Sequence, residues 1–97
     1  MAHLRLSEAA RADIRAIYRE GVERFGLAQA DAYTSVLREA IKRLAAYPES
    51  APFRKGLGGP VRVLPVRSHI VIYAIDAGGV HILRIRHTRE DWIASAP

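Results

Sequence analysis

The chain has 97 residues, of which 49% are hydrophobic and 26% charged, and it contains no cysteine. This length and composition are typical of one folded domain, here residues 1–97, and they exclude disulfides and a thiolate metal site. No run approaches the roughly 18 apolar residues of a membrane span. The first six residues alternate and do not form a signal peptide. We therefore expect a cytoplasmic protein with no membrane partner.

The chain is also basic, with 15 Lys and Arg against 10 Asp and Glu, a net charge of +5 and a pI near 10.2. Arginine outnumbers lysine, and its planar guanidinium suits phosphate, carboxylate and RNA bases. The charge admits a nucleic acid or an acidic protein as partner. A solvated basic surface without a partner is the third interpretation.

The first half of the chain predicts one strand and two helices. Residues 2–6 alternate between polar and apolar, as a short strand does. Ser7 offers a helix N-cap, and apolar residues then recur at steps of three and four until Gly26, a residue type that commonly ends helices. A second apolar stripe predicts a helix over residues 28–46. Because the connection at Gly26 is very short, the two helices must fold back as an antiparallel hairpin.

The second half predicts a loop and three strands. Residues 48–60 are rich in Pro and Gly, and we expect a surface loop without secondary structure that carries Arg54 and Lys55. The predicted strands cover residues 61–65, 69–76 and 79–87. Pro65 indicates that its strand lies at an edge or leaves the sheet there.

The predicted order is β-α-α-β-β-β. The fold class is α+β: a two-layer sandwich in which the antiparallel helical hairpin packs on a small, mainly antiparallel sheet. The strand over residues 69–76 is apolar on both faces. Such a strand is either central or has an outer face that awaits a partner.

Motifs for metal, phosphate or nucleophilic chemistry are missing from the sequence. Alternation places His81 and His87 on one strand face, about 20 Å apart, which is too far for one metal ion. The Gly-rich segment 56–60 lacks the following helix and the Lys-Ser/Thr pair of a phosphate loop. No serine stands in a nucleophile motif. We therefore expect no metal site and no cofactor.

A cationic cluster at the end of the last predicted strand comprises Arg84, Arg86, His87 and Arg89. Alternation places Arg84 and Arg86 on one face and His87 on the other. Cleavage of RNA needs a general base, a general acid and cationic stabilisation of the phosphorane, much of which this cluster could supply. The alternative, which spacing alone favours, is an exposed strand end with weak surface ion pairs. Trp92 is better suited to packing a C-terminal turn onto the sheet than to stacking bases.

The ordered pattern of residues resembles the ParE-type toxins of the RelE/ParE superfamily of bacterial toxin–antitoxin modules. The resemblance covers residues 4–92 and rests on Leu6-Ser7-x-x-Ala10-x-x-Asp13-Ile14-x-x-Ile17-Tyr18, Phe25-Gly26, Ala30-x-x-Tyr33, Leu44-Ala45-x-Tyr47-Pro48, Arg67-Ser68-His69 with Tyr73, and Val80-x-Ile82-Leu83-Arg84-Ile85-x-His87-x-Arg89-x-Asp91-Trp92. It implies the β-α-α-β-β-β architecture predicted above.

The resemblance also implies a partner and a target. The partner is a cognate acidic antitoxin whose partly disordered segment folds on the toxin. DNA is contacted only indirectly, through the antitoxin. The target is DNA gyrase, which the toxin poisons by binding without being an enzyme, so that no residue is catalytic. The candidates for binding the target are Arg84, Arg86, His87, Arg89 and Trp92.

Two alternatives to a gyrase toxin remain open. RelE-like members of the superfamily cleave mRNA in the ribosome; here His87 would be the general acid or base, and Arg84 or Arg86 would stabilise the phosphate. The other alternative is a degenerate member that no longer arrests growth and serves only as a binding or regulatory partner. The overall pattern, with two long helices and His87-x-Arg89-x-Asp91-Trp92, lies nearer the ParE side.

Overall fold

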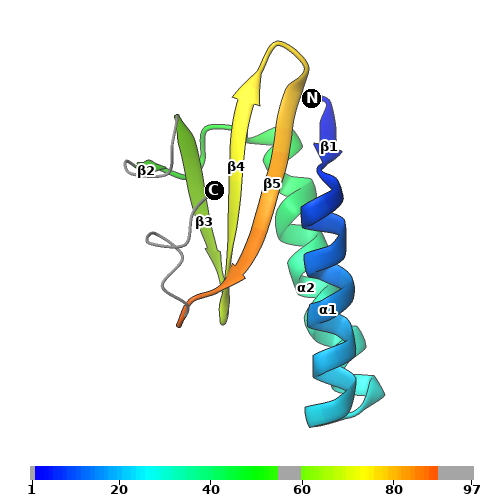
Figure 1. The fold of residues 1–97 in the computed structure, drawn as a ribbon. Coiled ribbons are helices and arrows are strands. Elements are labelled where there is room, and N and C mark those ends of the chain that lie inside the picture. Colours follow the sequence, from blue (N-terminus) through cyan, green and yellow to red (C-terminus); the bar gives the residue numbers. More distant parts are fainter. Residues whose placement is uncertain (1, 55–59, 90–97) are drawn as a thin grey trace.

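The computed structural model describes residues 2–54 and 60–89. Their elements are β1 (Leu4–Leu6), α1 (Glu8–Phe25), α2 (Leu27–Ala46), β2 (Phe53–Arg54), β3 (Val61–Val66), β4 (His69–Asp76) and β5 (Gly79–His87). Figure 1 shows the two helices side by side on one face of the sheet. The predicted α+β sandwich, with its helical hairpin on a small sheet, is confirmed.

The hairpin begins and turns where the sequence predicts. The Ser7 hydroxyl accepts the Ala10 N–H at 2.9 Å, which caps α1. Gly26 is the single residue between the helices, and its φ of 89° is accessible mainly to glycine. The helices approach closely beyond this turn, since a Cβ added to Gly21 would lie 3.3 Å from Cβ of Ala30.

The sheet has the strand order β1-β5-β4-β3-β2, with β1 parallel to β5 and the other pairs antiparallel. The strand 69–76 (β4) is therefore central in the sheet, which was one of the two interpretations of its apolar faces. The N-terminal segment runs beside the start of β5, where the Val80 N–H donates to the His3 carbonyl at 2.7 Å. A Cβ on Gly79 would meet that carbonyl oxygen at 2.2 Å, so only glycine fits there.

Two apolar clusters account for the two apolar faces of β4. The larger lies between the helices and the sheet and includes Val71 and Tyr73, both fully buried. Burial raises the pKa of the Tyr73 hydroxyl, which donates to the Pro48 carbonyl at 2.8 Å. The smaller cluster lies on the opposite face and includes Ile70 and Ile72.

The loop predicted over residues 48–60 was wrong in one respect, because it contains the two-residue strand β2. Phe53 lies opposite Arg62 in an antiparallel pair with β3. The Arg62 guanidinium stacks over the Phe53 ring, 4.0 Å from its centroid, and Nη1 donates to the Ala51 carbonyl at 2.7 Å. These contacts stabilise a strand too short to have a signal of its own. Lys55, the other cation predicted for this loop, lies outside the described residues.

The prediction that His81 and His87 share a strand face was wrong because β5 contains a bulge between them. Ile72 lies opposite Arg84 while Tyr73 lies opposite Ile82, so Leu83 is an extra residue. The bulge places both Ile82 and Ile85 in the helix-facing cluster although they are three positions apart. His81 and His87 therefore lie on opposite faces of the sheet.

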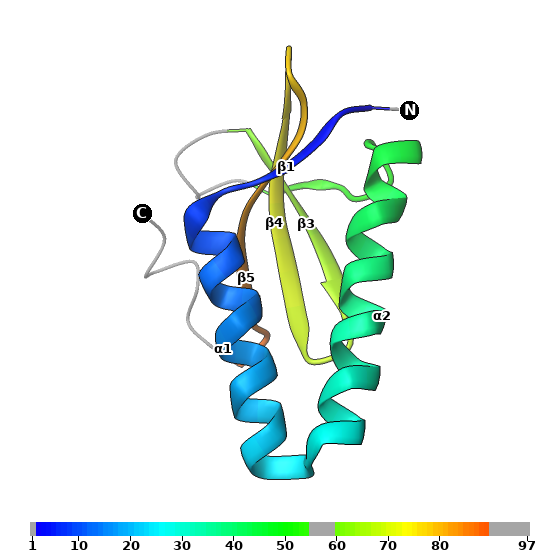
Figure 2. The ribbon, with the colours of Figure 1, turned by 90° about the vertical axis from the view of Figure 1, so that its right-hand side faces the viewer.

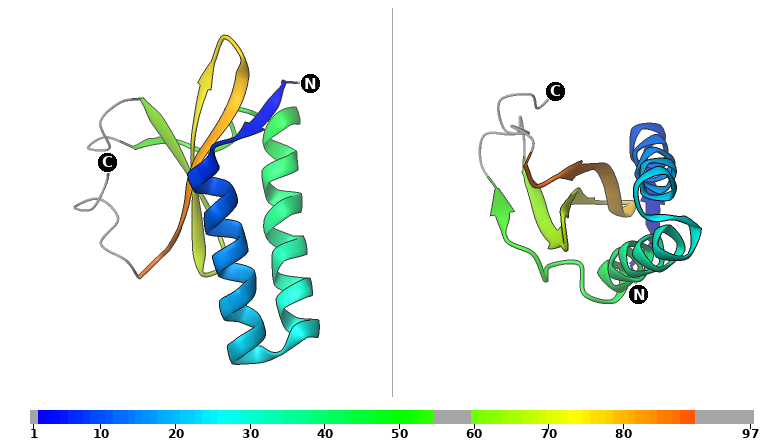
Figure 3. Two further views of the ribbon diagram at one scale, coloured as in Figure 1. Left: turned by 45° about the vertical axis from the view of Figure 1, so that its right-hand side comes forward. Right: turned by 90° about the horizontal axis from the view of Figure 1, so that it is seen from below.

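The helical hairpin is longer than the sheet it covers. Figures 1 and 2 show its tip extending past the end where β4 begins and β5 finishes, and Figure 3 shows from two further sides that both helices lie on the same face. The last turns of α1 and the first turns of α2 thus overhang the end of β5. None of the described helices is long and apolar enough to cross a membrane.

Candidate functional site

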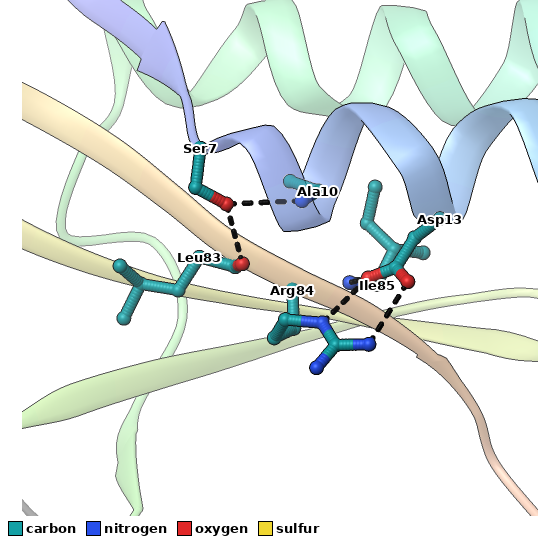
Figure 4. A network of polar contacts seen from close by, with 6 residues as sticks. All are labelled: Ser7, Ala10, Asp13, Leu83, Arg84 and Ile85. Atoms are coloured by element: carbon teal, nitrogen blue, oxygen red, sulfur yellow. Dashed lines mark hydrogen bonds and ion pairs between the residues drawn. The ribbon is translucent and has the colours of Figure 1, made fainter. Parts of the chain in front are cut away.

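The first turns of α1 are joined to the bulge of β5 by side-chain hydrogen bonds (Figure 4). Ser7, besides capping its helix, donates its hydroxyl to the Leu83 carbonyl at 2.7 Å, and its N–H donates to the Ile82 carbonyl at 2.9 Å. A bulge leaves main-chain polar groups outside the regular strand ladder. Ser7 supplies partners for two of them.

Asp13, one helical turn and a half further on, binds the other side of the bulge. Its carboxylate accepts two bonds from the Arg84 guanidinium, from Nε at 2.9 Å and from Nη2 at 3.0 Å. The same carboxylate accepts the Ile85 main-chain N–H at 2.9 Å. The Asp13 side chain is only 15% exposed and that of Arg84 is 32% exposed. A forked pair of this kind, partly withdrawn from water, is stronger than an exposed ion pair.

Arg84 is therefore a member of the contact between α1 and β5. The sequence predicted it as a candidate for binding the target or a phosphate, and it shares a sheet face with Arg86, as alternation predicted. Its partner Asp13 lies 71 positions away in the chain. A pair so far apart in the chain cannot be predicted from a local sequence pattern.

His87 lies in a second polar cluster, which the sequence did not predict. It stands opposite His69 across the β4–β5 pair, and the two imidazole rings meet edge to face with centroids 5.1 Å apart. The Tyr33 hydroxyl of α2 lies 2.5 Å from Nδ1 of His69. These three residues, the Tyr33–His69–His87 cluster, come from α2, β4 and β5 and are all half-buried.

A main-chain hydrogen bond determines where neutral His87 carries its proton. Nδ1 of His87 accepts the Arg89 N–H at 3.0 Å, so the proton of the neutral imidazole is on Nε2. The Tyr33 hydroxyl accepts the Ser68 N–H at 3.2 Å and also bonds to Nδ1 of His69, and either partner of the second bond can be its donor.

A pocket of about 340 Å³ adjoins this cluster under the overhanging hairpin tip. Its lining combines apolar or small residues of the two helices, such as Ile17 and Ala30, with Tyr33 and both histidines. The full lining is Ile17, Glu20, Gly21, Arg24, Phe25, Gln29, Ala30, Tyr33, Thr34, Ser68, His69 and His87. A neighbouring hollow of about 360 Å³ continues along α1 to Asp13 and Arg86. Two adjoining hollows thus lie at the end of β5.

The remaining predicted site residues are placed as follows. Arg86 lies opposite Ile70, on the sheet face away from the helices, with part of its side chain in the second hollow. Arg89 is exposed just beyond β5. Trp92 lies outside the described residues. Within 2–54 and 60–89, no group of three or more His, Asp or Glu side chains is placed to hold a metal ion.

Three residues of these polar clusters were not predicted as site residues: Asp13, Tyr33 and His69. Asp13 has the appearance of a charged residue on the solvated side of a helix, and Tyr33 that of a core residue. The signal that could have found them is the sequence resemblance, since all three stand in its pattern. Their chemistry arises only when α1, α2 and the sheet are brought together.

Comparison with known proteins gives a consistent set of relatives. Residues 4–92 match the model of a family described as ParE toxin of type II toxin-antitoxin system, parDE. A protein named Toxin ParE1, from Mycobacterium tuberculosis, is 32% identical over 87 residues, which are 89% of this chain and 89% of that protein.

Solved structures agree in fold. A chain of a chromosomal ParDE toxin–antitoxin system from P. aeruginosa is similar with a TM-score of 0.79 and 26% identity, over 90% of this chain and 96% of that one. The toxin–antitoxin complex RelBE2 from Mycobacterium tuberculosis shares the fold at 21% identity, with a TM-score of 0.64 over 89% of this chain and 96% of that one.

Proposed function

Because the chain belongs to the ParE toxin family of type II toxin–antitoxin modules, we propose that it arrests growth by binding and inhibiting DNA gyrase and that a cognate antitoxin neutralises it. The observation that carries the proposal is the match over residues 4–92, which includes both helices and the whole of β5. The proposed toxin is a binding protein and not an enzyme. It acts in the cytoplasm, where its target is found.

The geometry at the end of β5 opposes two of the roles that RNA cleavage would give to these residues: phosphate binding by Arg84 and general-base catalysis by His87. Two nitrogens of the Arg84 guanidinium are bound to the Asp13 carboxylate, which opposes its use for a phosphate. Neutral His87 has its proton on Nε2, and its other nitrogen faces the Arg89 N–H. A general base must present an unprotonated nitrogen to the substrate hydroxyl. In its neutral form His87 lacks one directed away from the main chain.

The antitoxin proposed as partner is acidic, and its contact with this chain is partly electrostatic. The net charge of +5 favours association with a negatively charged segment. The similar solved structures are described as toxin–antitoxin systems or complexes, which supports a hetero-oligomer. DNA would then be reached only through the antitoxin.

We propose that the gyrase contact includes Arg86 and His87, which line the hollows at the end of β5, the exposed Arg89 just beyond them, and Trp92. Arg84 contributes in this proposal mainly by holding the end of β5 in place. An Arg-rich rim beside a pocket is a common composition for a protein-binding site.

Purified protein tests the proposal directly. We expect it to inhibit supercoiling by gyrase and to leave mRNA on translating ribosomes uncut. Ribosome-dependent cleavage that disappears in His87→Ala would instead establish the RelE-like activity. A chain that inhibits neither process and does not arrest growth would be the degenerate member. If co-expression of an acidic protein encoded by the adjacent reading frame restores growth, that protein is the antitoxin.

A double variant tests the proposed contact. Arg86→Ala with Arg89→Ala should weaken gyrase inhibition by about tenfold or more, the size expected for loss of a few important contact residues. The matched control is Arg11→Ala with Arg15→Ala, which removes the same charge from the exposed side of α1. Equal effects of the two double variants would indicate that net charge, and not the end of β5, governs binding.

A further inference from the structure

We infer that Asp13 is a positioning residue of the toxin: by holding the bulge of β5, its carboxylate decides which sheet faces Arg86 and His87 occupy. The inference rests on the proposed function, in which the end of β5 contacts the target. Asp13 lies on α1 and is itself no part of the proposed contact.

The bulge exchanges the faces of every residue that follows it. Ile82 points toward the helices, so uninterrupted alternation would also point Arg86 toward them and His87 away. With Leu83 as an extra residue, Ile85 faces the helices instead. His87 then meets His69 on the helix side, and Arg86 lies opposite Ile70 on the other side.

Ser7, the N-cap residue, and Asp13 of α1 hold the bulge on both sides. The Ser7 N–H and hydroxyl donate to the carbonyls of Ile82 and Leu83, and the Asp13 carboxylate accepts the N–H of Ile85. The Leu83 carbonyl and the Ile85 N–H lie beyond the part of β5 that β1 covers, because β1 pairs only as far as Ile82. A partly buried N–H or carbonyl without a partner is costly. Ser7 and Asp13 therefore stabilise the bulged register over the regular one.

The Arg84 fork makes the arrangement specific to a carboxylate at position 13. One oxygen of Asp13 binds Nε of Arg84 together with the Ile85 N–H, while the other binds Nη2. An amide at this position keeps one acceptor oxygen but presents an NH₂ group to a guanidinium that has only donors. Asp13→Asn therefore loses the fork although its shape is almost unchanged.

The experiment combines gyrase inhibition with an NMR contact, in the full-length protein. In wild type, the ring protons of His69 and His87 should show a nuclear Overhauser effect because the rings touch. We expect Asp13→Asn to lose this contact and to raise the inhibitory concentration by about tenfold or more. Glu23→Gln, which removes an exposed carboxylate from the same helix, should change neither.

Arg84→Met is the second variant, and it keeps the inference testable if Asp13→Asn does not fold. It retains the Asp13 bond to Ile85, so we expect a smaller loss of inhibition than in Asp13→Asn, again accompanied by a weaker ring contact. Inhibition lost with the ring contact intact would overturn the inference, since the two residues would then act on the target directly. Retained inhibition in a variant without the ring contact would overturn it equally.

Failure of the proposed function is distinguishable from failure of this inference. A wild-type protein that does not inhibit gyrase removes the proposed function, whatever the variants do. A wild-type protein that does inhibit gyrase, with Asp13→Asn equally potent and the ring contact preserved, removes the positioning role alone.

Discussion

The Tyr33 hydroxyl and Nδ1 of His69 lie 2.5 Å apart, although 36 positions separate the two residues in the chain. The bond joins α2 to the first residue of β4, and the same hydroxyl accepts the Ser68 N–H. One phenol oxygen thus links the helical layer to the end of the sheet where the predicted contact residues emerge.

Tyr33→Phe should destabilise the protein, because it removes a partner from both Nδ1 of His69 and the Ser68 N–H. The expected decrease in the free energy of unfolding is about 1 to 2 kcal/mol, as for other half-buried hydrogen bonds. Urea denaturation measures it. The control is Tyr47→Phe: Tyr47 is 66% exposed, and we expect a change within about 0.5 kcal/mol. Equal stability of Tyr33→Phe and wild type would contradict the role given to this bond.

The protonation of His87 is testable by itself. In the neutral imidazole, ¹⁵N chemical shifts should report a protonated Nε2. This preference should persist in Tyr33→Phe, because it depends on the Arg89 N–H and not on Tyr33. A proton on Nδ1 of His87 in wild type would restore a role for this residue as general base.

The ion pair between Arg5 and Asp76 predicts that the stability of the protein decreases as the pH falls into the acid range. The Arg5 guanidinium and the Gly78 N–H lower the pKa of the Asp76 carboxyl from its usual 3.8. A carboxyl with a lowered folded-state pKa stabilises the protein above its unfolded-state pKa, and this contribution is lost as the pH falls through the folded-state value. The Tm of wild type should therefore exceed that of Asp76→Asn at neutral pH, and the difference should shrink below about pH 4.

The control for this pH series is Glu23→Gln, whose carboxylate is exposed on α1. Its Tm difference from wild type should stay nearly constant over the same range. If the Asp76→Asn difference did not shrink in acid, the Arg5–Asp76 pair would not be the source of the dependence.

Two glycine substitutions separate a steric clash from backbone strain. Gly79 and Gly26 both have positive φ, 104° and 89°. A Cβ on Gly79 would overlap the His3 carbonyl oxygen, whereas a Cβ on Gly26 meets nothing within 4 Å. We expect Gly26→Ala to cost about 1 to 3 kcal/mol through strain alone, and Gly79→Ala to cost more because β1 must also move. Urea denaturation of both variants gives the comparison. Equal decreases in the free energy of unfolding would show that β1 can move away from Gly79 without loss of stability.

Those features of the fold that depend on neighbouring residues were predictable. Ser7, the apolar stripes and Gly26 predict the helical hairpin because capping, period and turn are local properties. The two apolar faces of residues 69–76 predict a strand with at most one face open, and the structure makes it central. The family resemblance implied the same order of elements that the local patterns predict, over almost the whole chain.

The candidate site was predictable only in part. Arg84, Arg86, His87 and Arg89 were identified as a cluster, since they follow one another along the end of β5 and just beyond it. Their partners were not, since Asp13, Tyr33 and His69 lie on other elements and have no signal beyond the family pattern. The strand β2 was missed for the same reason: its two residues form a strand only beside Val61 and Arg62.

The sequence by itself determined the helical hairpin, the last two strands and the cluster of basic residues at the end of β5. These features depend on hydrophobic period, turn residues and composition. Only the tertiary structure decided on which sheet face each side chain at the end of β5 lies. The bulge at Leu83 reverses the alternation after it, and α1, whose Asp13 lies 71 positions from Arg84, supplies the hydrogen bonds that stabilise it. Strand faces follow the register, and register is set by partners that meet only on folding.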